Sequence, residues 1–341
     1  MKLLWSNADI GESVVGTGRP PRDRAPYCTP AAVLVFVLLL TTLGAAQEPK
    51  PAGKREGIRA GNRQTLSGPA GEPFNMPSDA AVGPNGDLYV LDGVCHRVVV
   101  FDVEGGLKCQ FGTRGSEPGQ FLYPLGIAAA PDGSVYVADS GNHRLQIFTS
   151  DGKPLSSISL PDTGSGTPPD PTDVAVDMAR RRAYIADNDN HCIAVYNLAS
   201  RSFEPVWGRP GRGERQFRYP FLIDLSADGY LLVVEPINTR VQVLSPNGKF
   251  VQFIGAWGVR PGQLFRPKGI ACCGNQVFVT DSYLGNVQVF DLDGTFLGPL
   301  ADGAGTPMEF VTPTGIAVDP QRRRLYIVEL KASQVCRVDL E

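Results

Sequence analysis

The chain has 341 residues and a formal net charge of −3, with 42% hydrophobic and 20% charged residues. This composition is typical of a globular protein and excludes an intrinsically disordered chain. The slightly acidic balance argues against a broad surface for binding nucleic acid, and the 39 glycines and 29 prolines favour many short strands joined by tight turns.

The N-terminal segment predicts export. An uncharged apolar run over residues 31–43 follows three arginines and has the length of a signal-peptide core. It is shorter than the roughly 20 residues that span a membrane. Gly44 and Ala46 supply the small residues that precede a cleavage site, so residues 1–46 are predicted to be a signal peptide. An uncleaved membrane anchor, with the remainder outside the cytoplasm, is the alternative.

Residues 47–66 follow as a linker that is expected to become ordered, and residues 67–341 contain one motif six times. The clearest copy spans residues 124–148, and an acidic residue ends the second apolar run of each copy. Successive acidic residues are 47, 48, 48, 46 and 48 positions apart. A period in the range of about 40–50 residues is typical of β-propeller blades. The six acidic residues are Asp92, Asp139, Asp187, Glu235, Asp281 and Glu329.

Each copy predicts four antiparallel strands. In the second copy the apolar runs cover residues 126–130, 135–138, 144–148 and 155–160, separated by turn residues. The sixth copy ends after its third run and lacks an outer strand, and an open strand edge is a liability. Residues 55–66 are placed to supply that strand. The predicted fold is an all-β, six-bladed propeller of four-stranded antiparallel blades, with the last blade closed by an N-terminal strand.

The third run of the second copy carries a family resemblance. Its sequence, Gly-Asn-His-Arg-Leu-Gln-Ile-Phe over residues 141–148, resembles the signature of the NHL repeat. Asn190-His191 repeats part of it, and His96-Arg97 is a weaker echo. The resemblance extends over all six copies and implies a six-bladed propeller, in agreement with the number of copies.

Two interpretations of the six acidic residues remain open. They can ring one mouth of the central channel and bind calcium or a cationic ligand. Alternatively, each accepts hydrogen bonds from the backbone amides of its own strand-to-strand turn. The second interpretation is favoured, because a residue repeated in every copy is best explained by what every copy needs.

The histidines and cysteines favour neither a metal nor another cofactor. His96, His143 and His191 occupy equivalent positions in three copies, where blades diverge from the axis too far for shared zinc ligation. The cysteines show no paired or zinc-binding spacing, which predicts free thiols. Amidating lyases with a similar fold place metal-binding histidines directly before the innermost strand. No histidine occupies the matching positions of this chain, which argues against lyase chemistry of that kind. The matching positions are Ser78, Leu125, Thr172, Phe221, Lys268 and Thr314.

Function is therefore expected in the segments that differ between copies. Arg209 and Arg212 lie in an arginine-rich loop, residues 208–217, and Arg240 and Tyr283 lie at the turns of copies four and five. These four residues join the six acidic ones as candidate binding residues. Two further basic turns, Arg180–Arg182 and Arg322–Arg324, are expected to be solvated.

The sequence thus predicts an exported NHL-repeat propeller that acts as a non-catalytic binding or scaffold module for a protein or glycan partner. It is expected to be a monomer that requires no cofactor and meets a membrane only through an uncleaved N-terminal segment. The alternative is a metal-dependent hydrolase, lactonase or lyase, using calcium or zinc in the central channel.

Overall fold

The computed structural model describes residues 57–341, and these form strands with one short 3-10 turn, Ser140–Asn142. The predicted signal peptide, residues 1–46, and residues 47–56 of the predicted linker lie outside the described residues. Across the described part of the chain, no helix has the length and apolar character needed to cross a membrane. The all-β prediction is confirmed.

Copies one to four each form a four-stranded antiparallel sheet in chain order. The first sheet contains β2 (Asp79–Val82), β3 (Leu88–Asp92), β4 (Arg97–Phe101) and β5 (Leu107–Phe111). The second contains β8 (Gly126–Ala129), β9 (Val135–Asp139), β10 (Arg144–Phe148) and β11 (Pro154–Ser159). The third contains β12 (Pro171–Asp177), β13 (Arg182–Asp187), β14 (Cys192–Asn197) and β15 (Ser202–Trp207). The fourth contains β18 (Ile223–Leu225), β19 (Leu231–Glu235), β20 (Arg240–Leu244) and β21 (Phe250–Ile254).

Copies five and six are joined by the first described strand, β1 (Ile58–Leu66). Copy five forms β22 (Pro267–Cys273), β23 (Gln276–Asp281), β24 (Asn286–Asp291) and β25 (Phe296–Ala301), and copy six forms β26 (Pro313–Asp319), β27 (Arg324–Glu329) and β28 (Gln334–Leu340). β1 pairs antiparallel with β28 and, over two residues, parallel with β25. A strand that precedes the first copy therefore lies beside the third strand of the last copy.

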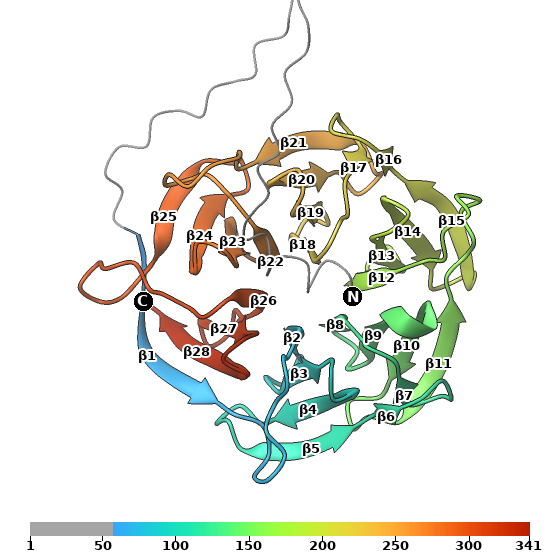
Figure 1. The fold of residues 1–341 in the computed structure, drawn as a ribbon, viewed down its shortest axis with the longest axis horizontal. Coiled ribbons are helices and arrows are strands. Elements are labelled where there is room, and N and C mark those ends of the chain that lie inside the picture. Colours follow the sequence, from blue (N-terminus) through green and yellow to red (C-terminus); the bar gives the residue numbers. More distant parts are fainter. Residues whose placement is uncertain (1–56) are drawn as a thin grey trace, which may run out of the picture. The chain divides into compact units, whose positions relative to one another are not determined.

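The first strand of every copy lies innermost, and the outermost strand is the fourth in copies one to five and β1 beside copy six (Figure 1). Each first strand neighbours that of the next copy, and β26 neighbours β2 in turn. Within residues 57–341, the buried apolar side chains form clusters between successive sheets, and one cluster joins copy six to copy one through Tyr326, Val328, Leu88 and Phe101. Middle strands such as β9 are buried throughout, because each sheet is covered on both faces.

The connections between copies are shaped by a glycine and an aromatic residue. β16 (Arg209–Pro210) and β17 (Gln216–Phe217) form a short parallel pair before copy four, and β6 (Thr113–Arg114) and β7 (Gln120–Phe121) do so before copy two. Gly208 has φ +96°, and a Cβ there would lie 2.3 Å from the ring of Phe217. Only glycine allows this close approach. The recurring aromatic residue thus packs within the scaffold.

Candidate functional site

The six repeated acidic residues are buried at the ends of the second strands, with exposed fractions of 0% or 1%. Each accepts a hydrogen bond from a backbone amide in the connection that enters its own sheet. Asp139 Oδ1 accepts from Leu122 N at 2.8 Å, and Asp187 Oδ1 accepts from Asp170 N at 2.9 Å. The equivalent donors to Asp92, Glu235, Asp281 and Glu329 are the amides of Asn75, Arg218, Arg266 and Val311.

This geometry supports the structural interpretation and changes one detail of it. The amide donors lie 15 to 18 residues before the acid, in the incoming connection rather than in the following turn. Asp281 also accepts from the amides of its own turn, Tyr283 and Leu284. A buried carboxylate that accepts several hydrogen bonds fixes the position where the chain enters each sheet.

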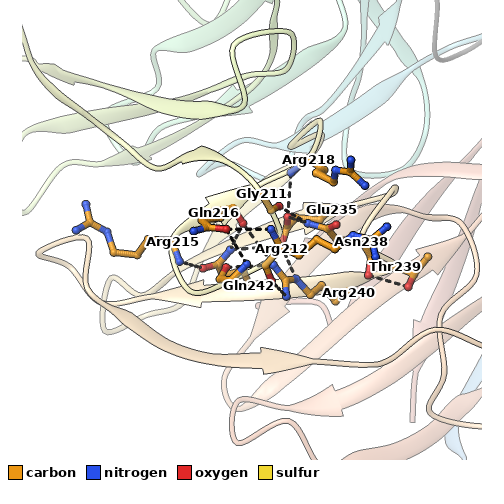
Figure 2. A network of polar contacts seen from close by, with 11 residues as sticks. Gly211, Arg212, Arg215, Gln216, Arg218, Glu235, Asn238, Thr239, Arg240 and Gln242 are labelled. Atoms are coloured by element: carbon orange, nitrogen blue, oxygen red, sulfur yellow. Dashed lines mark hydrogen bonds and ion pairs between the residues drawn. The ribbon is translucent and has the colours of Figure 1, made fainter. Parts of the chain in front are cut away.

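Three of the acids pair with an arginine that begins the third strand. Arg144 Nε lies 2.8 Å from Asp139 Oδ2, and Arg240 Nε lies 2.7 Å from Glu235 Oε2. The same guanidinium groups donate to carbonyl oxygens of the incoming connection, such as Arg212 O. Arg240, predicted as a binding residue, is thus largely buried in this network (Figure 2). The third member of the set is Arg97.

The repeated histidines also tie successive copies together. All three adopt left-handed backbone conformations, with φ of 55° or 56°, a region that histidine tolerates better than most residues. His96 Nδ1 accepts from Tyr123 N, and His191 Nδ1 accepts from Tyr219 N, each at 3.1 Å. Burial lowers the pKa of His96 and His191, which favours the neutral acceptor form. Among residues 57–341, no group of three or more His, Cys, Asp or Glu residues is placed to hold a metal ion.

The arginine-rich loop before copy four is different, because its side chains are exposed. Arg209, Arg212, Arg215 and Arg218 are exposed, and none forms an ion pair with a carboxylate of the described residues. Figure 2 shows the guanidinium groups of Arg215 and Arg218 pointing away from the buried network. The loop backbone is anchored below them, since Gly211 O accepts from Asn238 Nδ2 at 3.1 Å.

Exposed apolar side chains lie at the same end of the sheets. Ile237 and Tyr283 occupy the tips of the turns that follow the second strands of copies four and five. Trp257 and Val259, in the connection between these copies, are 71% and 62% exposed. We call the following set the arginine–aromatic surface: Arg212, Arg215, Arg218, Ile237, Trp257, Val259, Arg260 and Tyr283.

The other two basic turns lie at the opposite end of the strands and are largely neutralised. Arg180 pairs with Asp177 at 2.8 Å, and Arg182 pairs with Glu204 at 2.8 Å. Arg322 and Arg324 pair in the same way with Asp319 and Asp339. These pairings leave little net charge to attract a polyanion, in contrast with the unpaired arginines before copy four.

The innermost strands hold three acids that were not predicted from the sequence, of which Asp79 and Asp173 are buried and Asp224 is partly buried. Asp79, Asp173 and Asp224 each accept a hydrogen bond from an amide of the next copy's first strand, namely Ile127, Ile223 and Cys272. Burial raises the pKa of Asp79 to about 8 and that of Asp224 to about 6. Burial and the charge of Asp79 raise the pKa of Asp173 well above its usual range. Asp79 and Asp173 follow the equivalent residues Ser78 and Thr172, but the other copies have no acid at that position, so only their placement distinguishes these acids from surface acids.

The six described cysteines are free, with Cys192 and Cys336 buried and the other four partly buried. Cys272 lies next to Asp224 on the innermost strands, and burial raises the pKa of its thiol well above the ordinary value. A thiol whose pKa is raised stays protonated at neutral pH, and the protonated form is a poor nucleophile.

Comparison with known proteins agrees with this architecture. The NHL repeat family model matches residues 74–101, 121–148 and 169–196. Protein brain tumor of Drosophila melanogaster is 45% identical over 51 residues, which are 15% of this chain and 5% of that protein. A probable peptidyl-alpha-hydroxyglycine alpha-amidating lyase of Caenorhabditis elegans, pgal-1, is 39% identical over 54 residues, 15% of each protein. These matches therefore span only a small part of the relatives' length.

Solved structures resemble the fold over a much longer stretch. A streptogramin B lyase superposes with a TM-score of 0.58 at 13% identity, covering 82% of this chain and 98% of that one. A virginiamycin B lyase from Staphylococcus aureus gives 0.56 at 15% identity over 78% and 80% of the two chains, and Kuenenia stuttgartiensis hydrazine synthase gives 0.56 at 17% over 78% and 77%. At these identities the likeness concerns the fold alone. The chain thus contains segments that match the NHL repeat, and its fold is that of a β-propeller.

Proposed function

We propose that the six copies form the six blades of one propeller and that β1 completes the last blade. The closed cycle of neighbouring first strands supports six blades, as does the apolar cluster between copy six and copy one. The antiparallel pairing of β1 with β28 supports closure by the N-terminal strand. Such a body needs no second chain to complete its core, which supports a monomer.

The function that this geometry supports best is a non-catalytic binding module. The arginine–aromatic surface carries the proposal, because it combines unpaired positive charge with exposed apolar side chains on one end of the sheets. Interfaces are enriched in aromatic residues and arginine, and exposed apolar groups of this kind mark interaction sites. The partner that fits is an acidic protein surface, since Ile237 and Val259 offer contacts for aliphatic side chains. An anionic glycan is the other outcome to be tested.

The proposed location is outside the cytoplasm. The uncharged apolar run at residues 31–43, with small residues at 44 and 46, supports export through a cleaved signal peptide. The partner is therefore sought among exported or cell-surface molecules.

Charge reversal on the arginine–aromatic surface tests the proposal. The variant R212E/R215E/R218E is compared with K153E/R181E/K249E, which changes three exposed positive residues at the opposite end of the strands. Proteins and glycans of the exported fraction that bind the wild-type protein are quantified at low and high salt. We expect the first variant to lose binding at least about tenfold and the second to retain it. Equal binding by both variants refutes the proposed surface.

A metal-dependent hydrolase or lyase is the second candidate, favoured by the matches to lyases. Those matches concern the fold and one short segment of sequence. Among residues 57–341, no group of three or more His, Cys, Asp or Glu residues is placed to bind the metal that such an enzyme needs. The metal content of the purified protein separates the two candidates.

A further inference from the structure

A single lysine stands out among the residues that begin the innermost strands. Lys268 is the second residue of β22, and the equivalent positions of the other copies hold uncharged residues. They are Ser78, Leu125, Thr172, Phe221 and Thr314. Lys268 thus places one positive charge at the end of the inner strands where the connections enter the sheets.

The ammonium group of Lys268 has no carboxylate partner among residues 57–341. Its Nζ lies 4.5 Å from the centroid of the Phe221 ring, a cation–π contact with the preceding copy. The side chain is only partly exposed. Removing a cation from water without a counter-ion is costly, so an aromatic face offsets only part of the cost.

The acids on neighbouring elements are engaged elsewhere. Asp281, at the end of β23, accepts from the amides of Phe265 and Arg266. Asp224 on β18 accepts from the amide of Cys272, while Asp319 lies at the far end of β26 and pairs with Arg322. None of these acids forms an ion pair with Lys268.

A second positive group lies beside the first. Arg266 is exposed, two residues before Lys268, and residues at this spacing face the same side of an extended chain. Its guanidinium carbon lies 5.9 Å from the centroid of the Tyr283 ring. Burial, together with the charge of Arg266, lowers the pKa of Lys268 to about 8. Each of the two cations thus contacts one aromatic ring and has no carboxylate partner among residues 57–341, which makes an environment that attracts an anion.

We propose that Lys268 and Arg266 form a binding site for the carboxylate of a small organic ligand, with the rings of Phe221 and Tyr283 flanking its apolar part. The carboxylate supplies the missing counter-ion of Lys268, and Arg266 offers the planar donor pair that suits a carboxylate. The proposal does not rest on protein binding by the arginine–aromatic surface, although Tyr283 belongs to both sets of residues.

Benzoate is the probe, with benzamide as its neutral counterpart, and binding is measured by calorimetry and NMR titration at pH 7. We expect benzoate to bind and benzamide not to bind. Lys268→Met should weaken benzoate binding at least about tenfold, because a charge-assisted hydrogen bond is lost, whereas Lys268→Arg should retain most of it. Lys249→Met removes an exposed lysine from a distant turn and should have no effect. Inorganic phosphate, tested in parallel, distinguishes a carboxylate site from a general anion site, and tighter phosphate binding overturns the carboxylate assignment.

The pH dependence gives an independent readout. Only the protonated lysine binds the anion, so the affinity should fall about tenfold per pH unit above pH 8, and Lys268→Arg should remove this fall. Lys268→Met should not lower the melting temperature, since it removes an uncompensated charge. Equal affinity in the wild type and Lys268→Met, or no saturable benzoate binding, overturns the proposal. A lower melting temperature for Lys268→Met would instead indicate a structural lysine.

Discussion

At the residue scale, the repeated acidic residue holds the incoming connection against its sheet through hydrogen bonds. Asp139 receives one backbone amide and three side-chain donors, including Arg144 Nε at 2.8 Å and Asn142 Nδ2 at 2.9 Å. Copies that lack the arginine use other donors, as where Asn190 Nδ2 donates to Asp187. The acid is retained in all six copies while its partners vary.

Replacement of Asp139 by alanine should destabilise the protein by about 3–5 kcal/mol, because Arg144 would be left buried without its counter-ion. Chemical denaturation measures the change. Asp151→Ala is the control, since Asp151 forms an exposed ion pair with Lys153 in the same copy and should leave stability nearly unchanged. Similar losses in both variants would contradict the structural role of the buried pair.

The raised pKa of Asp79, on the innermost strand of copy one, predicts that folding stability depends on pH. The pKa of Asp79 is raised from 3.8 to about 8, so the folded state binds more protons than the unfolded state between these values. Stability should therefore fall as pH rises from about 4 to about 8, by on the order of 1 kcal/mol per pH unit.

Asp79→Asn keeps an acceptor for the amide of Ile127 and removes the titration. The variant should match the wild type near pH 4 and become increasingly more stable than it towards pH 8. Thermal melts across this range measure the difference. Asp228→Asn, at an exposed turn, is the control. A constant difference between Asp79→Asn and the wild type at all pH values would show that Asp79 does not titrate in this range.

At the element scale, β1 is the strand whose role depends most on long-range contacts. Its Ala60 is 1% exposed within the cluster formed by copies five and six, and Leu66 packs against the cluster between copies six and one. Five residue pairs align β1 with β28, more than 260 positions later in the chain. These contacts are the ones that the proposed closure by β1 depends on.

Deletion of residues 57–66 should lower the melting temperature by at least about 10 °C, because it removes the outer strand of the last copy and exposes two apolar clusters. Deletion of residues 47–56 has the same length and should have little effect. Differential scanning calorimetry of the two deletion variants, each otherwise carrying the whole chain, compares their melting temperatures. Equal melting temperatures would mean that β1 is not needed to close the structure.

At the scale of the whole molecule, repetition separates scaffold from candidate function. The acids, the histidines and the aromatic residues of the connections recur and are engaged in contacts between copies. The cations without a carboxylate partner among residues 57–341 do not recur, and they include the arginines of the arginine–aromatic surface and Lys268. A closed repeat architecture permits this division, since single copies can vary at exposed ends without loss of the common core.

A binding module of this kind should purify without stoichiometric metal. We expect mass spectrometry of the protein, prepared without chelators, to find calcium and zinc well below one ion per chain. Protein dialysed against a chelator and then reloaded with each metal is the control for loss during preparation. Near-stoichiometric calcium or zinc would instead favour the metal-dependent enzyme and direct attention to the acids of the innermost strands, Asp79, Asp173 and Asp224.

The sequence by itself determined the strands, their grouping into copies and the need for an additional outer strand. These follow from local physics: the alternation of apolar runs and turn residues repeats about every 48 residues, and every copy shows it. Even the histidine position is locally encoded, because its left-handed backbone favours few residue types.

Only the tertiary structure decided which polar side chains form hydrogen bonds or ion pairs within the protein and which remain exposed. The amide that Asp139 accepts lies 17 residues earlier, and the amide that Asp79 accepts lies 48 residues later in another copy. Both distances follow the repeat, but the sequence does not identify which amide donates, since these hydrogen bonds depend on how the connections and sheets pack. For the same reason Arg240 and Arg212 look alike in the sequence, yet one is buried in an ion pair and the other is exposed. The packing of the sheets determines which side chains are buried or held in ion pairs. The side chains that remain exposed are the ones that a ligand can contact.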